Sequence, residues 1–227
     1  MALLGGLQQP LAPTSWKGFT SHVCGGRMEI TYVRSDFLHE RDESPPPNIN
    51  GQPQHGYSSF HWAQLDGYHV VVLNTGIHML SDDNVTQRAL LFARRFAALP
   101  PNQTLVWRTT VPGHDNCAAV TMPLAARYEP ASGPYGWQHV ERQNRLVASV
   151  FDRVAPGRVA LLDAFAVSNA RADRHIALKT RMQTLADGTV VRTEVADCLH
   201  YCLPSVVDTW NVLLGPLLKS ASRFRAW

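Results

Sequence analysis

The chain has 227 residues, of which 45% are hydrophobic and 17% charged, and its formal net charge is +3. This composition is typical of a single globular domain and excludes a disordered chain or a coiled coil. No run approaches the roughly 18 apolar residues of a membrane span. The basic residues form no stripe with interleaved aromatics, so nucleic-acid binding is not predicted.

The first third of the chain contains two predicted strands and a loop. Residues 1–27 show no clear period and are interrupted by Gly and Pro. Residues 28–38 alternate in part and are rich in β-branched and aromatic side chains, which predicts a strand. The proline-rich stretch 39–57 is expected to be a surface loop. Residues 68–74 are a continuous apolar run, typical of a strand buried on both faces of a parallel sheet.

The remaining elements alternate between helix and strand. A helix capped by Asp82, Asp83 or Asn84 is predicted to end before Pro100-Pro101. It is followed by a strand at 104–110, a loop at 111–134, a helix at 135–154, a strand at 158–163 and a helix that starts after Pro204. Residues 164–196 look irregular, with a tight turn at Asp187-Gly188. Gly215-Pro216 is expected to kink or end the last helix.

Strands that alternate with helices indicate an α/β fold with a mostly parallel sheet. In such sheets the functional side chains follow the carboxyl ends of the strands. This rule selects Asn74-Thr-Gly76, residues 108–114 and the segment that begins at Asp163.

Asp197 and His200 are the most informative local pair. A carboxylate three residues before a histidine can share one face of a turn with it and hold the imidazole as a general base. A solvent-exposed pair beside a disulfide is one alternative. The other is a zinc site. Its ligands would be Cys198, His200 and Cys202, together with Cys24 or Cys117.

Three more residues are candidates for contact with a substrate. Asn74, at a strand end, either donates its amide to an oxyanion or caps a turn. Arg108 and His114 bring a cation and an imidazole to the same edge of the sheet, and the alternative for Arg108 is a structural salt bridge. Tryptophans that either stack on sugars or pack in the core are Trp107, Trp137 and Trp210.

Cysteines and sequons favour an oxidising compartment. The four cysteines are Cys24, Cys117, Cys198 and Cys202, and the N-glycosylation sequons begin at Asn84 and Asn102. A secreted chain is expected to start with a signal peptide or an anchor, and residues 1–6 have neither pattern. The sequence therefore predicts either a cytosolic protein or a chain that lacks residues before Met1.

Four blocks of sequence together resemble the PC-esterase family, which includes the plant trichome-birefringence-like polysaccharide O-acetyltransferases. The blocks are V-L-N-T-G at 72–76, W-R-T-T-V-P-G-H at 107–114, L-D-A through R-A-D-R-H at 162–175, and D-C-L-H-Y-C-L-P with D-T-W-N at 197–211. The last block is the most specific. The resemblance covers approximately residues 28–220.

The resemblance implies a single SGNH-like domain over residues 1–227 with a three-layer α/β/α fold. It implies a Ser-His-Asp mechanism in which a serine takes an acyl group and passes it to a sugar hydroxyl or to water. His200 and Asp197 match the catalytic D-x-x-H of the family, and Asn74 matches its N-T-G block. Disulfides from Cys198 and Cys202 to Cys117 or Cys24 are also implied.

The implied partners are an acyl donor and a carbohydrate acceptor, with no cofactor and no metal ion. The implied location is the secretory pathway, either on the lumenal side of the Golgi membrane or outside the cell. We expect a monomer, attached to a membrane only through an amino-terminal anchor that this sequence does not contain.

The sequence departs from the family pattern at the nucleophile. The serine of the family lies in a Gly-Asp-Ser motif on the first strand, and no Gly-Asp-Ser occurs in this sequence. Residues 1–7 look like the end of the helix that follows that motif. We therefore expect an amino-terminally truncated chain that lacks the first strand and has no acetyl-transfer or acetyl-esterase activity by itself. The alternative is a non-catalytic carbohydrate-binding relative that begins at Met1.

Overall fold

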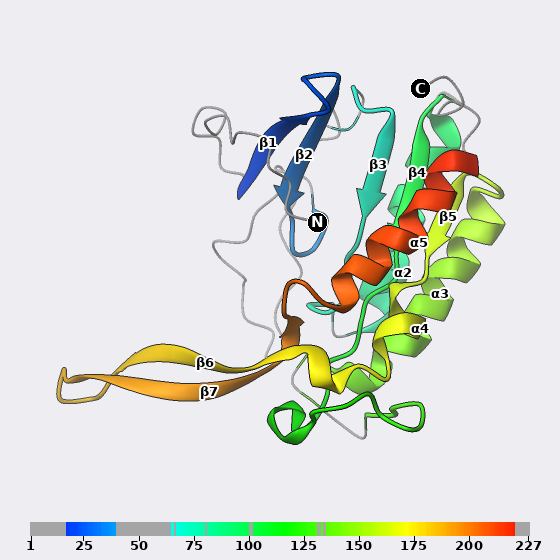
Figure 1. Ribbon diagram of the computed structural model, residues 1–227. Coiled ribbons are helices and arrows are strands. Elements are labelled where there is room, and N and C mark those ends of the chain that lie inside the picture. The colour runs from blue at the N-terminus through cyan, green and yellow to red at the C-terminus, as the bar shows by residue number, and fades with distance from the viewer. Residues whose placement is uncertain are drawn as a thin grey trace.

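A three-stranded parallel sheet forms the centre of the protein, shown in Figure 1 as a computed structural model. The structure describes residues 17–39, 65, 67–79, 81–99, 102–130, 133 and 135–220. In spatial order the strands are β3 (Val70–Leu73), β4 (Thr104–Arg108) and β5 (Val159–Leu162). Helix α2 (Asp82–Ala98) lies between β3 and β4 in the chain, and α3 (Val140–Val154) lies between β4 and β5. The predicted α/β fold with a parallel sheet is confirmed.

Helices α2 and α3 cover one face of the sheet with an aromatic core. The ring centroid of Phe92 in α2 lies 6.1 Å from that of Trp107, which lies 5.2 Å from that of Phe151 in α3. The buried side chains of α2 recur at helical spacing and so lie on one side of the helix. They are Val85, Ala89, Phe92, Ala93 and Phe96.

Helix α5 (Val206–Ser220) covers the opposite face of the sheet, which gives three layers (Figure 1). Val106 and Leu162 are buried on that side, outside the aromatic core. The helix continues through Pro216 to Ser220, so of the two predicted alternatives, a kink or an end at Gly215-Pro216, the end is wrong. A proline removes one main-chain hydrogen bond, but its fixed φ is compatible with a helix.

The remaining boundaries differ from the predictions in detail. Ser81 caps α2, because its side chain accepts a hydrogen bond from the main-chain N–H of Asn84 at 3.1 Å. The predicted helix at 135–154 is a short 3-10 turn (Trp137–His139) followed by α3.

The predicted strand at 28–38 is β2 (Met28–Arg34). It pairs in antiparallel fashion with β1 (Lys17–Val23), a strand that the sequence pattern did not predict. The reason is exposure: Phe19 and Tyr32 are 45% and 50% exposed, so no buried face imposed a period. The predicted loop at 39–57 lies outside the described residues except for His39, which is buried.

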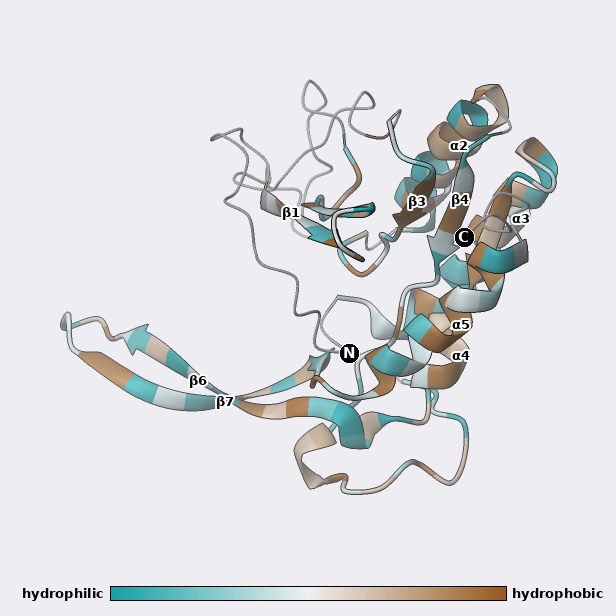
Figure 2. Cartoon of the chain, turned by 45° about the horizontal axis from the view of Figure 1, so that its top comes forward, coloured by the Kyte–Doolittle hydropathy of each residue, from teal (hydrophilic) through white to brown (hydrophobic). Residues whose placement is uncertain are grey.

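A long ribbon replaces the irregular structure expected at 164–196. Helix α4 (Ala164–Ser168) is followed by the antiparallel strands β6 (His175–Thr184) and β7 (Val190–Tyr201), and the predicted turn lies between them. Figure 1 shows this ribbon projecting from the layered part of the molecule. In Figure 2 hydrophobic and hydrophilic segments follow one another along both strands. Because neither face is covered, no alternating pattern was required of the sequence.

No helix in the described part of the chain is both long enough and apolar enough to cross a membrane.

Candidate functional site

The site selected by the sequence lies where β3 and β4 end. The side-chain amide of Asn74 donates to the main-chain oxygen of Arg108 at 2.8 Å and to Oγ1 of Thr110 at 3.2 Å. Its Oδ1 accepts a hydrogen bond from Nη2 of Arg108. Exchanging the amide nitrogen and oxygen would place donor against donor and acceptor against acceptor, so this orientation is determined. Both amide hydrogens of Asn74 are therefore used within the protein.

Gly76 makes this contact between the two strand ends possible. Its φ is +147°, and a Cβ at this position would lie 2.5 Å from Oγ1 of Thr110. The hydroxyl of Thr110 in turn donates to the main-chain oxygen of Thr75 at 2.8 Å. The N-T-G sequence thus has a local reason: the asparagine holds β4, and the glycine lets Thr110 come close.

Arg108 is a half-buried cation with incomplete hydrogen bonding. Its guanidinium carbon lies 4.8 Å from the centroid of the Trp210 ring. Burial lowers the pKa of Arg108 to about 10, and the nearby Tyr201 hydroxyl acts in the opposite direction. Its Nη1 is buried without a hydrogen-bond partner, and no carboxylate in the described residues pairs with it. The structural salt bridge considered for Arg108 is therefore absent among the described residues.

Asp197 and His200 make the predicted contact near the end of β7. The Nδ1 of His200 lies 2.9 Å from Oδ1 of Asp197, and that oxygen also accepts the main-chain N–H of His200 at 3.1 Å. The carboxylate bonds to the main chain as in a turn, although the segment belongs to a strand. The strand pairing is irregular opposite this point, between His175 and Ala177.

Asp197 and His200 differ in how far their side chains are exposed. The side chain of Asp197 is 5% exposed and that of His200 is 66% exposed. Asp197 also accepts a hydrogen bond from Nζ of Lys179 at 2.5 Å. Burial raises the pKa of Asp197, but the hydrogen bonds from Lys179 and His200 outweigh it and hold the pKa well below its usual range. The carboxylate is therefore charged at neutral pH and accepts the Nδ1 proton of the imidazole.

One disulfide attaches this segment to the loop that follows β4. Cys117 and Cys198 are bonded, with their Cα atoms 5.5 Å apart. The main-chain N–H of His114 also donates to the oxygen of Cys198 at 3.0 Å. Cys24 and Cys202 are exposed free thiols, so the second disulfide expected among the four cysteines is not formed. Cys24 lies in the exposed turn between β1 and β2, which comes before the strands of the parallel sheet in the chain.

The zinc alternative fails because Cys198 is in the disulfide. Within the described ranges, no group of three His, Cys, Asp or Glu side chains is placed to hold a metal ion.

His114 lies in the interior and not at a solvent-facing edge. It is 0% exposed, and its ring nitrogens contact Nε2 of His175 and the main-chain oxygen of Asn169, each at 2.7 Å. The expectation that it contacts a substrate is therefore wrong for this structure. Trp107 and Trp137 are buried as well, in agreement with the core alternative for both. Trp210 is only partly buried, and its indole N–H donates to Oγ of Ser168 at 2.9 Å.

His78 is a site residue that the sequence reasoning missed. It follows Asn74 by four positions, and its Nε2 lies 3.9 Å from Oδ1 of Asp36. Burial lowers the pKa of His78, Asp36 raises it, and the charges of Arg34 and His200 lower it further. His78 and His200 are thus electrostatic neighbours although they are far apart in sequence. Its position directly after the N-T-G block was the available signal.

Asn74 and the Asp197–His200 pair are not hydrogen-bonded to each other. Aromatic side chains connect the end of β7 to Arg108. Tyr201 lies 5.9 Å from Trp210, ring centroid to ring centroid, and Trp210 faces Arg108. The predicted convergence of Asn74, Asp197 and His200 in one cleft stays a prediction.

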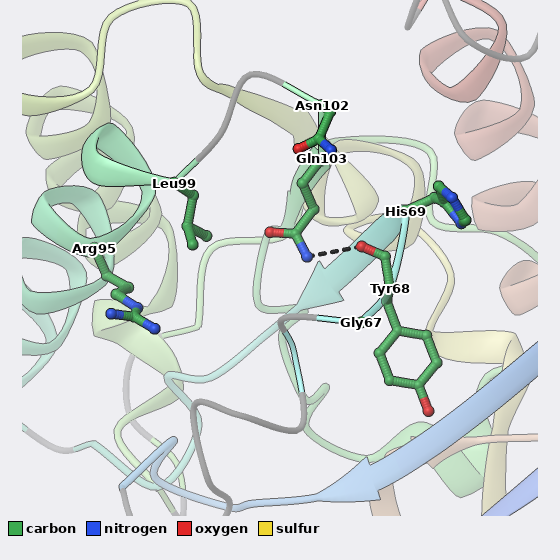
Figure 3. Close-up of a pocket in the computed structure, with 7 residues that line it drawn as sticks. All are labelled: Gly67, Tyr68, His69, Arg95, Leu99, Asn102 and Gln103. Carbon is green, nitrogen blue, oxygen red and sulfur yellow. Dashed lines mark hydrogen bonds between the residues drawn. The ribbon is translucent and has the colours of Figure 1, made fainter.

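A hollow of about 360 Å³ lies at the other edge of the sheet, where β3 and β4 begin. Figure 3 shows Gln103 at its centre, with its amide directed at the main-chain oxygen of Tyr68. The remaining lining residues are Gly67, His69, Arg95, Leu99 and Asn102. This hollow is remote from the carboxyl ends of the strands and contains none of the candidate catalytic or substrate-binding residues, although Asn102 of the second sequon lines it.

Comparisons with known proteins identify relatives. The model of the PC-Esterase family, described as a GDSL/SGNH-like acyl-esterase family found in Pmr5 and Cas1p, matches residues 85–216. The chain is 31% identical over 133 residues to xylan O-acetyltransferase 6 of Oryza sativa subsp. japonica, a match that covers 56% of this chain and 22% of the relative. It is 28% identical over 201 residues to protein trichome birefringence-like 15 of Arabidopsis thaliana, covering 76% of this chain and 40% of the relative. The chain thus spans less than half the length of either relative.

Proposed function

Because this chain belongs to the PC-esterase family of GDSL/SGNH-like acyl-esterases, we propose that it is part of a polysaccharide O-acetyltransferase or acyl-esterase. Its relatives include proteins named xylan O-acetyltransferases. The observation that carries the proposal is the contact between the buried Asp197 carboxylate and the exposed imidazole of His200.

In this proposal His200 is the general base. Asp197 accepts the proton on Nδ1, so the lone pair of the imidazole is on Nε2. Since the side chain of His200 is 66% exposed, a hydroxyl can approach it. The base takes the proton of a serine hydroxyl while the serine attacks the acyl carbon, and it gives that proton to the leaving group as the bond to the donor breaks. A sugar hydroxyl or water then attacks the acyl-serine and gives its proton to the neutral His200. His200 returns this proton to the serine oxygen as the bond between the acyl group and the serine breaks.

The serine is the component that these residues do not supply. Gly-Asp-Ser does not occur in the sequence, and three other serines are poor candidates for the nucleophile. Ser168 is 0% exposed and accepts the indole N–H of Trp210. Ser205 accepts the main-chain N–H of Val206 at 2.5 Å, where α5 begins. The buried Oγ of Ser35 has no hydrogen-bond partner among the described residues and does not reach the solvent. We therefore propose that the nucleophile comes from a Gly-Asp-Ser segment outside the sequence given.

Arg108 and Asn74 are proposed to lie beside the acyl group or the sugar. The support is the charge of Arg108, which no described carboxylate neutralises, and its contact with the partly buried Trp210. Since both amide hydrogens of Asn74 are used, its direct role as an oxyanion donor requires that it release Thr110 or Arg108. Asn74 is therefore proposed first as the residue that orients the guanidinium.

A secretory location is proposed with this function. The Cys117–Cys198 disulfide supports it, because such bonds persist in oxidising compartments.

A second candidate function is carbohydrate binding without catalysis, and the absence of Gly-Asp-Ser favours it. The two candidates differ in what they require of His200. Binding alone needs no general base, whereas acyl transfer depends on it.

The test is an acetyl-ester hydrolysis and acetyl-transfer assay on two proteins. One is the 227-residue chain, and the other is the same chain extended by a family Gly-Asp-Ser strand and helix. We expect His200-dependent turnover only in the extended protein, and a loss on the order of 10⁴–10⁶ in turnover for its His200→Ala variant. His22→Ala, in the exposed hairpin β1–β2, is the control. If the extended protein were equally active without His200, the proposal would be contradicted. If both proteins bound oligosaccharide without turnover, the second candidate would be favoured.

A further inference from the structure

A pair of buried histidines contacts the strand that carries the Asp197–His200 pair. His114 is 0% exposed and His175 is 4% exposed. The Nδ1 of His114 lies 2.7 Å from Nε2 of His175. Neither ring has a role in the function proposed above.

The outer nitrogen of each ring contacts a main-chain oxygen. The Nε2 of His114 lies 2.7 Å from the oxygen of Asn169, and Nδ1 of His175 lies 3.1 Å from the oxygen of His200. A carbonyl oxygen can only accept a hydrogen bond. Both outer nitrogens must therefore carry a proton if both contacts are hydrogen bonds.

Counting protons then fixes the charge of the pair. Two neutral imidazoles hold two protons in total, and both are required at the outer contacts. The two inner nitrogens, 2.7 Å apart, would then face each other as lone pairs. A third proton between them turns this contact into a hydrogen bond and gives the pair one positive charge. With only two protons, one of the three short contacts must be without a hydrogen bond.

The surroundings of the pair act on its charge in both directions: burial disfavours a positive charge, whereas aromatic rings and nearby carboxylates favour one. The ring centroid of Tyr128 lies 4.6 Å from that of His114, and that of Tyr201 lies 4.2 Å from that of His175. Aromatic faces stabilise a cation at such distances. The charged and titratable groups that act on the pair from the adjoining elements are Asp115, Tyr128, Asp173, Asp197, His200 and Tyr201.

We propose that His114 and His175 share one proton, and that the singly charged pair positions His200 by holding its main-chain oxygen. The effect of this positioning on catalysis rests on the function proposed above, because His200 is the general base only in that proposal. His175 acts through His200 and is a positioning residue. The proton comes from solvent, and its loss leaves the contact between His175 and the oxygen of His200 without a hydrogen.

Electrostatics sets the pH range of the singly charged state. Burial, followed by the charge on His114, lowers the pKa of His175 to about 4. Burial also lowers the pKa of His114 from its ordinary value of 6.5. The pair therefore gives up its shared proton at a lower pH than an exposed histidine gives up its own. The hold on His200 weakens as the pH rises through that transition.

The test is NMR on the 227-residue chain between pH 4 and 7, with ¹⁵N-labelled histidine rings and ¹³C-labelled carbonyls. We expect a pH interval within this range in which three nitrogens of the pair are protonated, and two protonated nitrogens at pH 7, with the ¹³C shift of the His200 carbonyl following the same midpoint. The titration is repeated in His200→Gln, which keeps the carbonyl and removes the ring. His175→Gln should abolish the coupled shift, and His22→Gln, on the exposed strand β1, should leave it unchanged.

Two protonated nitrogens throughout this range, or a His200 carbonyl that does not follow the pair, would overturn the proposal, and both results come from unsubstituted protein. Neither readout needs substrate or turnover. An extended protein that is inactive while the carbonyl still follows the pair would refute the proposed function alone. In an active extended protein, His175→Gln should change the pH profile of kcat and leave KM nearly unchanged, which a merely structural defect would not do.

Discussion

At each edge of the parallel sheet a side-chain amide connects neighbouring segments, but the two amides have different partners. Where β3 and β4 begin, Nε2 of Gln103 donates to the main-chain oxygens of Leu65 and Tyr68 at 2.6 and 2.7 Å. Where the strands end, Asn74 bonds to main chain, hydroxyl and guanidinium together. Beyond Asn74 lie a half-buried cation and an exposed imidazole held by a carboxylate, whereas the other edge borders the hollow of Figure 3, which Tyr68 and Arg95 help to line.

We propose that this difference separates a structural contact from a functional one. The Oε1 of Gln103 has no hydrogen-bond partner in the described part of the chain, and its amide only connects segments of main chain. At the carboxyl edge, charges with perturbed pKa values lie at the end of β4 and in β7, and a disulfide attaches β7 to the loop that follows β4. Perturbed titratable groups are a better guide to a site than the presence of a hollow.

The largest effect is expected from the disulfide that fixes the carboxyl edge. The Cys117→Ser/Cys198→Ser double variant removes a bond that closes a loop with a sequence separation of 81. We expect it to lower the free energy of unfolding by about 4 kcal/mol, because the unfolded chain gains freedom. Urea unfolding measures this, with the exposed Cys24→Ser as the control. A loss equal to that of the control would show that the carboxyl edge does not depend on the bond.

The two amides provide the sharpest comparison between the edges. Asn74→Ala should lower the free energy of unfolding by about 3 kcal/mol. It removes a partner of the half-buried Arg108 guanidinium as well as two neutral hydrogen bonds. Gln103→Ala should cost about half as much, because only neutral hydrogen bonds are lost. Chemical denaturation of both variants measures the two losses in free energy of unfolding. Equal losses would mean that the charge of Arg108 adds nothing.

Asp197→Asn should destabilise the protein in a pH-dependent way. At pH 7 we expect a loss of about 2 kcal/mol, the typical value for hydrogen bonds to a charged group. The native pKa of Asp197 lies below its ordinary value of 3.8, so this stabilisation is complete above about pH 4–5 and is lost as pH falls through the native pKa. Stability curves from pH 2 to 7 measure it. The control is Asp152→Asn on α3, and a pH-independent difference for Asp197→Asn would contradict the account.

The smallest effect is expected at the opposite edge. The hydroxyl of Tyr68 donates to Oγ1 of Thr31 at 2.5 Å, which connects the segment before β3 to β2. Tyr68→Phe should cost about 1 kcal/mol, as for one neutral hydrogen bond. Thermal unfolding measures the cost, with the exposed Tyr32→Phe as the reference. A change in the NMR signals of His200 in this variant would show that the two edges are coupled.

The sequence could predict the elements whose side chains face a core. The apolar runs of β3, β4 and β5 and the helical spacing in α2 follow from burial, so their pattern is visible in the chain. The ribbon β6–β7 and strand β1 were missed because their faces are exposed. Leu178 and Met182 of β6 are 54% and 62% exposed, and such positions impose no period.

The candidate site divides in the same way. Asp197 and His200 are three residues apart, so a local turn brings them together and the spacing predicts the contact. The partners of His114 are 55 and 61 positions further along the chain, and only the tertiary fold shows that the ring is buried. Lys179 reaches Asp197 through the pairing of β6 with β7, which the sequence pattern did not predict.

The central claim is that the carboxyl edge, with His200 as its accessible base, is the functional edge of this sheet. The most direct test is to titrate the 227-residue chain with an acetylated xylo-oligosaccharide and to follow the ¹H–¹⁵N NMR signals of both edges. The account predicts shifts at His200, His78 and Arg108, and none at Tyr68 and Gln103. Shifts confined to Tyr68 and Gln103, or no shifts at either edge, would contradict it.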